Sequence, residues 1–268
     1  MNVTAIFTCY NRKDKTLNCV DKLLTNECIS TIVAVDDGST DGTDEGLRSY
    51  GDKVIYVRGD GNLFWNRGMH KGIDYVKGHD IVSEYYLLVN DDVDFAPGVI
   101  DRMITEAGDQ KILVGATYDT DGNLTYGGIK LRKKKSLKYD MIGPNQPDTE
   151  CDTFNMNCAL IPSRIFNEIE NMDPYYEHGM GDFDYGFEVS RRGYEIRVFR
   201  EYVGLCNENS IKGTWQDRSL GRLERIRKKE SRKGLPFKDW FHYLNKNYGL
   251  MTAIVRSFTP YIKILVGR

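Results

Sequence analysis

The sequence predicts an α/β protein whose mostly parallel sheet is flanked by helices, with a helical extension at the C-terminal end. Short apolar runs typical of buried strands alternate with longer segments whose apolar residues recur at helical spacing. Clusters of polar residues, above all aspartates, directly follow several of these runs. The 268 residues, 40% of them hydrophobic and 28% charged, suffice for one large soluble α/β domain or two small ones.

Four expected strands lie in the first part of the chain. Each is a short apolar run of the kind found in parallel sheets: residues 3–8, 31–35, 54–57 and 85–89. Asn11 is expected to cap the helix that follows the first strand, and Leu17, Val20, Leu23 and Leu24 form its apolar face.

Further elements are expected after residue 98. They are a helix over 99–107, a strand over 112–117, a hairpin turn at Gly122-Asn123, a basic loop over 132–138, a return to the core over 153–162 and a helix over 163–170.

The densest chemical signal is the acidic cluster that follows the run beginning at Tyr85. It holds Asn90, Asp91, Asp92 and Asp94 within five residues. Carboxylates repel one another and lose solvation when buried, so this cluster indicates a cation, and hard oxygen ligands suit Mg²⁺ or Mn²⁺. A solvated acidic turn that caps the helix after Pro97 is the alternative.

A second aspartate-rich turn, Asp36-Asp37-Gly38-Ser39-Thr40-Asp41-Gly42, follows the second strand. It is not an EF-hand calcium loop, because Arg48 stands where that loop has its bidentate glutamate. Ligands of doubly wound sheets bind at the carboxyl ends of the strands. Thr8, Asp36-Asp37 and Asn90-Asp91-Asp92 are therefore expected to converge on one ligand.

The glycine-rich segment Gly59–Gly72 is expected to lead into a helix whose first backbone amides favour phosphate. It contains neither a Walker motif nor a dinucleotide fingerprint. Another candidate, Asp182, follows a flexible Gly-Met-Gly at the expected start of a helix that ends near Arg192. Its carboxylate gains from the helix dipole there, or it caps the helix; Asp184 is expected to be structural.

The charge is unevenly distributed along the chain. Between Lys212 and Arg268 there are 14 Lys and Arg against 4 Asp and Glu, although the whole chain carries −2. The six cysteines have no CxxC spacing, and no signal peptide or run of eighteen apolar residues is present, so we expect reduced thiols in a cytoplasmic protein.

Five motifs in one order give the chain a family resemblance over residues 3–210. They are Thr8–Arg12, Val35–Thr43, the segment from Gly61-Asn62 to Gly72, Asn90-Asp91-Asp92 and Gly181–Asp184. In these motifs the chain resembles the family-2 glycosyltransferases of the Rossmann-like GT-A fold, especially bacterial rhamnosyl- or hexosyltransferases that build polysaccharides on lipid carriers.

The resemblance implies an inverting, metal-dependent enzyme. It would move a hexosyl or deoxyhexosyl group from a UDP-, dTDP- or GDP-sugar to a hydroxyl of a glycan or lipid-linked acceptor in cell-surface polysaccharide synthesis. The catalytic domain would span 1–210, with a nucleotide-sugar half of about 1–95 and an acceptor half of about 96–210, followed by a basic amphipathic helical extension over 211–268.

The resemblance also implies roles for individual residues. Thr8 and Asp37 would contact the nucleotide base, Asp91 the ribose or sugar, and Asp92 the Mn²⁺ or Mg²⁺ ion, while Asp182 matches the catalytic base. The remaining donor-site residues are expected to be Tyr10, Asn11, Arg12, Asp36, Asn62, Trp65, Arg67 and Asn90, with Asp94 as a second metal ligand.

The chain departs from the family pattern at three positions. Gly181 stands where a glutamate usually precedes the base, Glu188 where an arginine often follows it, and Cys206 near the place of a metal-binding histidine. These departures keep open a non-catalytic sugar- or nucleotide-binding protein on the same fold. A sugar nucleotidyltransferase is a further alternative, but its glycine-rich loop after the first strand is absent here.

The basic extension suggests an anionic partner. Aromatic and aliphatic residues alternate with its cations, which is the composition of a helix at a membrane interface. We therefore expect a peripheral position on the inner face of the plasma membrane; in the alternative, the aromatic residues pack on the catalytic domain and the charges face water. No nucleic-acid-binding module is recognisable, so nucleic acid is not an expected partner.

Overall fold

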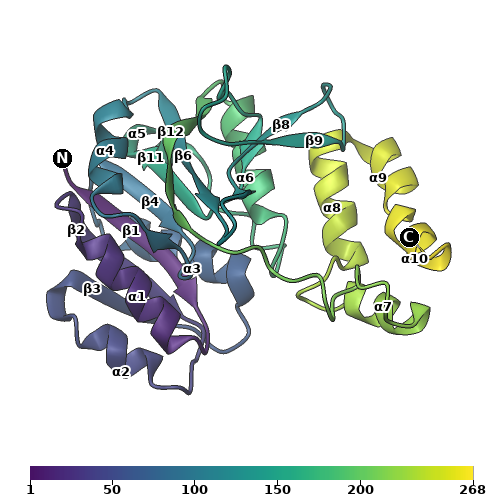
Figure 1. Cartoon of the computed structure of the whole chain (residues 1–268), viewed down its shortest axis with the longest axis horizontal. Helices are drawn as coiled ribbons and strands as arrows, with labels where there is room; N and C mark the ends of the chain where they lie inside the picture. Colours follow the sequence, from purple (N-terminus) through teal and green to yellow (C-terminus); the bar gives the residue numbers. More distant parts are fainter. Residues whose placement is uncertain (268) are drawn as a thin grey trace.

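The computed structural model of the protein describes residues 1–267. Its centre is a nine-stranded sheet of order β3-β2-β1-β4-β11-β6-β12-β5, with β7 paired to β6 (Figure 1). A three-stranded sheet of order β10-β8-β9 lies beside it. The strands are β1 (Val3–Cys9), β2 (Ile29–Asp36), β3 (Val54–Arg58), β4 (Tyr85–Val89), β5 (Asp94–Phe95), β6 (Lys111–Tyr118), β7 (Leu124–Tyr126), β8 (Gly128–Leu131), β9 (Tyr139–Ile142), β10 (Thr153–Phe154), β11 (Cys158–Pro162) and β12 (Glu195–Leu205).

Helices cover both faces of the sheet, and four more follow it. They are α1 (Lys13–Leu24), α2 (Thr43–Arg48), α3 (Phe64–Gly78), α4 (Val99–Glu106), α5 (Ser163–Glu168), α6 (Gly181–Arg191), α7 (Arg222–Lys229), α8 (Phe237–Tyr248), α9 (Leu250–Arg256) and α10 (Thr259–Leu265), with a short 3-10 helix over Gly51–Lys53. The expected α/β fold class and the hairpin at Gly122-Asn123 are confirmed.

The sheet is parallel in its first half and mixed in its second. Strands β3, β2, β1 and β4 all run parallel, as predicted. Strand β11 is antiparallel to both of its neighbours, β4 and β6. Its apolar run identified it as core, but such a run carries no information on strand direction.

Alternate residues of β1 supply two separate cores. Phe7 is buried on one face with Val20 and Leu23 of α1, whereas Ile6 is buried on the other with Met69 of α3. Each such side chain contributes roughly 1.5–3 kcal/mol when fully buried. This two-sided burial holds β1 inside the sheet, between β2 and β4.

The start of α1 differs from the prediction. Arg12, not Asn11, is the N-cap residue, and it makes no capping hydrogen bond with its side chain. Instead, Asp41 Oδ2 accepts a hydrogen bond from the backbone amide of Lys13 at 2.9 Å. Asn11 has a left-handed φ of 49°, and its Oδ1 accepts from the amide of Thr40 at 2.7 Å. Asn11 and Asp41 thus join the loops after β1 and β2.

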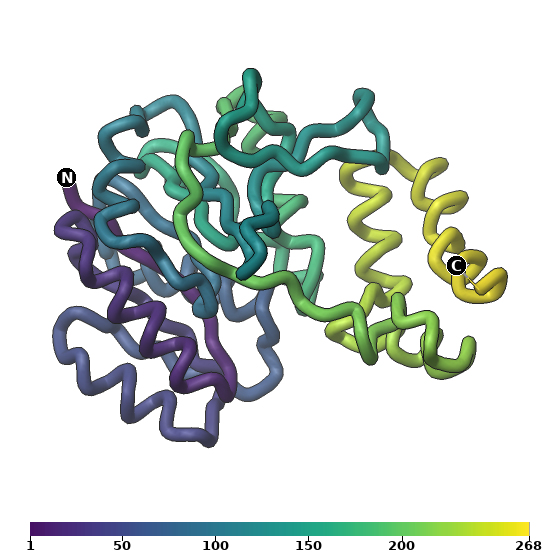
Figure 2. Tube along the Cα trace, in the orientation of Figure 1, coloured from purple at the N-terminus to yellow at the C-terminus, as the bar shows by residue number. Residues whose placement is uncertain are grey.

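The C-terminal extension is docked on the α/β part of the molecule. Figure 2 shows the chain crossing, after β12, to helices that lie at the opposite end from the N-terminus. Tyr243 and Leu244 of α8 are buried in a third core, against which Phe183 and Phe187 of α6 pack. Aromatic residues expected at a membrane interface thus pack inward on α8. Arg268, the last residue of the expected extension, lies outside the described residues.

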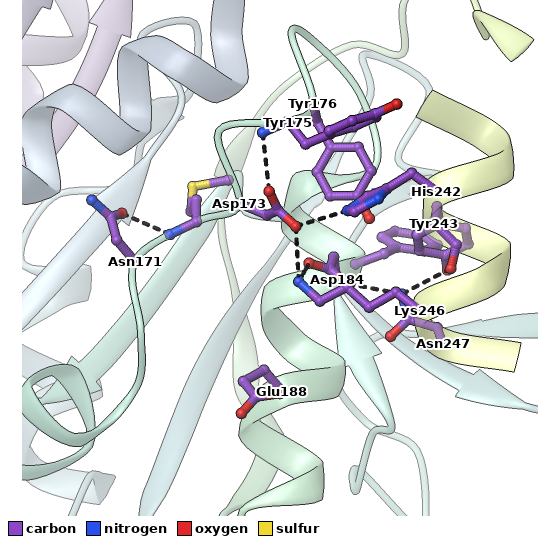
Figure 3. Close-up of polar contacts among 12 residues, drawn as sticks. Asn171, Asp173, Tyr175, Tyr176, Asp184, Glu188, His242, Tyr243, Lys246 and Asn247 are labelled. Carbon is purple, nitrogen blue, oxygen red and sulfur yellow. Dashed lines mark hydrogen bonds and ion pairs between the residues drawn. The ribbon is translucent and has the colours of Figure 1, made fainter. Parts of the chain in front are cut away.

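Polar contacts reinforce this docking (Figure 3). Lys246 of α8 lies 2.7 Å from a carboxylate oxygen of Asp184 and 3.0 Å from one of Asp173, and His242 Nε2 lies 2.9 Å from the same Asp173 oxygen. Asp184 is buried. Its expected structural role is explained by these contacts.

Helices α9 and α10 carry a different kind of surface. Eight large apolar side chains are exposed there: Leu250, Met251, Ile254, Val255, Phe258, Ile262, Leu265 and Val266. Within residues 1–267, no helix is long and apolar enough to cross a membrane.

Candidate functional site

A cavity of about 380 Å³ opens at the carboxyl ends of β1, β2 and β4. Of the residues expected to converge at these strand ends, Thr8, Asp37 and the Asn90–Asp92 cluster all line it, whereas Asp36 does not. The predicted residues in its wall are Thr8, Tyr10, Arg12, Asp37, Trp65, Asn90, Asp91, Asp92 and Asp182.

Five predicted site residues do not line this cavity: Asn11, Asp36, Asn62, Arg67 and Asp94. Asp36 is fully buried and accepts hydrogen bonds from the Ser39 amide and the Tyr56 hydroxyl. Asp94 turns toward α1, where its Oδ1 lies 3.7 Å from Lys22 Nζ.

Two more of these five residues, Arg67 and Asn62, contact neighbouring loops. Arg67 Nε donates to the carbonyl of Pro174 at 3.0 Å, and Asn62 Oδ1 accepts from Arg232 at 3.3 Å. Both side chains therefore hold surrounding segments in place.

The acidic cluster contains its own cation. Arg12 Nη1 lies 3.2 Å from Asp91 Oδ1 and 3.0 Å from Asp92 Oδ2. Thr16 Oγ1 donates to the other oxygen of Asp91 at 2.8 Å. Burial raises the pKa of Asp91 to about 6, and Arg12 opposes that rise. The repulsion that indicated a metal ion is thus partly relieved by a protein side chain.

Asp92 is the carboxylate that remains accessible for a metal. About 22% of its side chain is exposed, and its Oδ1 lies 3.8 Å from Cys206 Sγ. Burial and Asp92 raise the pKa of Cys206 to about 12, which leaves a neutral thiol and a poor ligand. No three His, Cys, Asp or Glu side chains among the described residues are arranged to hold a metal. One carboxylate still fits Mg²⁺ or Mn²⁺ when diphosphate and water oxygens complete the shell.

Asp37 organises the glycine-rich segment before α3. Its Oδ1 accepts the amides of Gly61 and Leu63, and its Oδ2 accepts that of Phe64 at 3.0 Å. The prediction that the first amides of this helix face a phosphate is therefore wrong for Phe64, because Asp37 occupies that amide. Asp37 is 5% exposed.

Asp182 lies at the first turn of α6 and lines the same cavity as Asp92. Its side chain is partly buried, and its Oδ1 accepts the amide of Phe183 at 2.8 Å. Burial raises the pKa of Asp182 to about 6, opposed by that amide. A carboxylate with this pKa is ionised at neutral pH yet basic enough to accept a proton.

Gly181 has a steric explanation. A β-carbon there would lie 1.6 Å from Oδ1 of Asn66, which is fully buried in α3. Nδ2 of Asn66 donates to the carbonyls of Asp173 and Tyr176, each at 2.8 Å. Asn66 thus fills the space that a side chain at position 181 would need. Glu188 pairs with Arg191 and Arg192 on α6 and does not line the cavity.

Two cavity residues that the sequence did not predict carry side chains able to bind a polar ligand. His178 precedes the Gly-Met-Gly segment, and its Nδ1 is buried without a hydrogen-bond partner. Lys233 reaches the cavity from the loop between α7 and α8. The only sequence signal for His178 is its position four residues before Asp182. Lys233 belongs to the basic extension that was expected to meet a membrane surface or, in the alternative, to face water. The others missed are Cys9, Gly61, Phe64, Tyr126, Asn155, Met156, Asn157, Gly179 and Asn209.

Known structures with this fold include several glycosyltransferases. A Staphylococcus aureus TarS structure, residues 1–349, aligns with a TM-score of 0.58 and 12% identity over 98% of this chain and 81% of that one. The mannosyltransferase PcManGT from Pyrobaculum calidifontis, in complex with GDP-Man and Mn²⁺, aligns with a TM-score of 0.55 and 15% identity over 99% and 78%.

A third neighbour, GalNAc-T7 with UDP, GalNAc and Mn²⁺, has a TM-score of 0.56 and 13% identity. This chain is covered over 98% and spans only 54% of that longer protein. None of the curated protein sequences matches the chain significantly. The family model described as "Glycosyl transferase family 2" matches residues 4–169, more than half of the chain. Together with the GT-A architecture of the sheet, this match shows that the chain belongs to glycosyl transferase family 2.

Proposed function

We propose that this protein is an inverting, metal-dependent glycosyltransferase that moves a sugar from a nucleoside-diphosphate sugar to an acceptor hydroxyl. The observation that carries the proposal is that Asp182 and Asp92 line one cavity at the carboxyl ends of the strands. A base for the acceptor and a carboxylate for a metal on the donor then act on one substrate pair. The GDP-Man, UDP and Mn²⁺ in the neighbours' structures agree with a donor and metal of this class.

In the proposed reaction, Asp182 accepts the proton of the acceptor hydroxyl as that oxygen attacks the anomeric carbon. The bond from this carbon to the diphosphate oxygen breaks on the opposite face, so the configuration inverts. General-base catalysis of this kind contributes about 10²–10⁴-fold. When bound, Mn²⁺ or Mg²⁺ supplies positive charge that offsets the charge developing on the leaving diphosphate.

The remaining cavity residues bind and orient the donor in this proposal. Arg12 holds Asp91 and Asp92 together, so that Asp92 is presented to the cavity in a fixed orientation. Trp65 donates from Nε1 to Asn90 Oδ1 at 2.8 Å, which orients an aromatic ring in the wall. Thr8, Tyr10 and Asp37 would line the nucleoside part of the site.

We also propose a membrane-associated acceptor, in keeping with cell-surface polysaccharide synthesis on a lipid carrier. The eight exposed apolar side chains of α9 and α10 support this location. Arg256 and Lys263 lie among them, and no Asp or Glu follows Asp239 in the sequence. A helical surface of apolar residues with cations suits the interface of an anionic membrane.

The proposed function is tested by incubating the protein with UDP-, GDP- and dTDP-sugars and Mn²⁺. We expect slow metal-dependent release of nucleoside diphosphate from one donor, and faster release when a lipid-linked or glycan acceptor is added. Binding without release under any condition would favour a non-catalytic sugar-nucleotide-binding protein. Formation of a nucleotide sugar from a sugar phosphate and a nucleoside triphosphate would instead identify a nucleotidyltransferase.

A further inference from the structure

We infer that the C-terminal extension completes the donor site, with Lys233 as the contact to the donor diphosphate. The inference rests on the proposed function, because it assigns a role within the same cavity. The loop between α7 and α8 brings Lys233 to a wall otherwise built by residues before 210. A segment outside the family-model match at residues 4–169 thereby becomes part of the site.

The loop that carries Lys233 is held against the cavity by its neighbours. Arg232 Nε lies 3.0 Å from Glu177 Oε2, and its guanidinium lies 5.2 Å from the ring centre of Phe64, a cavity residue. After the loop, Lys238 Nζ lies 2.9 Å from Glu177 Oε1. Cations on both sides of Lys233 are thus anchored to one carboxylate.

Glu177 is well placed to act as that anchor. Its side chain is only 9% exposed, and Arg67 Nη1 of α3 approaches its Oε1 to 3.8 Å. Glu177 directly precedes His178, so the anchor and the cavity wall belong to the same loop. Because partly buried ion pairs are screened less than exposed ones, these contacts fix the loop more firmly than surface pairs would.

The cavity is acidic, so a diphosphate that binds there needs an additional cation to offset its negative charge. Four aspartates line the cavity, and Arg12 is already paired with Asp91 and Asp92. Lys233 forms no ion pair with a carboxylate among residues 1–267. A lysine ammonium is a compact point charge that suits phosphate oxygens, and in this position it has no competing partner.

His178 adds a second group on the same wall. Its Nδ1 is buried and lacks a hydrogen-bond partner, which is costly unless a ligand supplies one. Burial, together with Lys233 and Arg12, lowers the pKa of His178 to about 4, so the ring is neutral at physiological pH. A neutral imidazole can donate one hydrogen bond to a phosphate or sugar oxygen while Lys233 provides the charge.

The experiment compares Lys233→Ala and Lys233→Arg with wild type and with Arg227→Ala. Arg227 is an exposed cation of the same extension that does not line the cavity. Isothermal titration with Mn²⁺ measures the affinities of UDP, GDP and dTDP and of the matching monophosphates. Melting temperatures without ligand confirm that each variant is folded.

We expect Lys233→Ala to weaken diphosphate binding about tenfold or more, and monophosphate binding clearly less. Lys233→Arg should recover most of the loss, and Arg227→Ala should bind like wild type. Glu177→Gln, a change at the anchor, should weaken the diphosphate preference in the same direction.

Two results would overturn the inference while leaving the proposed function intact. One is diphosphate affinity unchanged by Lys233→Ala; the other is an equal loss for monophosphate and diphosphate, since that would exclude a contact to the added phosphate. Failure of the wild-type protein to bind any of the three diphosphates would overturn both proposals.

Discussion

Nη1 of Arg12 lies 3.0 Å from Oδ2 of Asp92, the carboxylate that we propose as the metal ligand. The same nitrogen lies 3.2 Å from Oδ1 of Asp91, whose side chain is 6% exposed. One guanidinium thus links a buried carboxylate to an accessible one. Arg12 holds the acidic cluster together before any ligand binds, and this role leads to the first prediction.

Arg12→Ala should destabilise the protein, because it leaves the buried Asp91 without its charge partner. Uncompensated buried charges cost about 3–5 kcal/mol, and since Arg12 itself is 43% exposed we expect about 2 kcal/mol in the free energy of unfolding. Urea denaturation measures this quantity. The exposed Arg218→Ala is the control, and Asp91→Asn in the Arg12→Ala background should recover part of the loss. A loss no larger than that of the control would contradict the role of Arg12.

The second prediction separates two aspartates of one cluster. Asp92→Asn should remove most of the gain in nucleoside-diphosphate affinity that Mn²⁺ provides, because Asp92 is the more exposed of the two cluster carboxylates that line the cavity. Asp94→Asn should retain that gain, because Asp94 faces Lys22 on α1. Titration of each variant with and without Mn²⁺ measures the gain. Equal losses in both variants would show that the cluster binds the metal as a unit.

The third prediction concerns stability and pH. Burial raises the pKa of Asp182 from its ordinary value of 3.8 to about 6, so the folded state favours the protonated form. The stability that this group contributes is therefore present below pH 4 and is lost as the pH rises through about 6.

At neutral pH the folded protein must bury the ionised carboxylate of Asp182, and Asp182→Asn removes that cost. We expect its melting temperature to exceed that of wild type by about 2–4 °C at pH 7.5, with the difference vanishing near pH 4. Differential scanning calorimetry at the two pH values measures it. A melting temperature lower than wild type at pH 7.5 would mean that the ionised carboxylate stabilises the fold.

The fourth prediction concerns the apolar surface of α9 and α10. Ile254→Glu combined with Phe258→Glu should abolish salt-sensitive sedimentation with anionic phosphatidylserine-containing vesicles. Val82→Glu is the matched control, since Val82 is 79% exposed elsewhere on the molecule. Loss of self-association in the double variant, without vesicle binding by wild type, would show instead that this surface joins two copies of the chain.

Much of the candidate site could be predicted because polar residues follow apolar runs directly. Each strand was recognisable from its apolar run, and a polar residue lies at or just after its end: Thr8, Asp37 and Asn90. Parallel strands bring such ends together. The direction of β11 could not be predicted in this way. All five of its residues are buried, and such an apolar run is compatible with a parallel or an antiparallel strand.

Other features depend on contacts between distant segments. Asp94 belongs to β5, a two-residue strand that pairs with β12, and this pairing turns it away from Asp92. Lys233 lines the cavity from a loop whose flanking cations, Arg232 and Lys238, pair with Glu177. No local pattern in the sequence encodes either contact.

The same limit applies to Gly181. Its departure from the family pattern kept a non-catalytic binding protein open, but the space beside it is filled by Asn66, more than a hundred residues earlier. The departure is therefore compatible with a working base at the next position, because a side chain at position 181 would clash with Asn66.

The central claim is that Asp182 is the catalytic base, and the most direct measurement is the single-turnover rate of sugar transfer by Asp182→Asn at saturating donor. We predict a rate about 10²–10⁴-fold below that of wild type, with an unchanged dissociation constant for the nucleoside-diphosphate sugar. In wild type, the rate should fall as the pH drops below about 6, where the base becomes protonated. A variant that keeps the wild-type rate, or that loses donor affinity as far as it loses turnover, would contradict the claim.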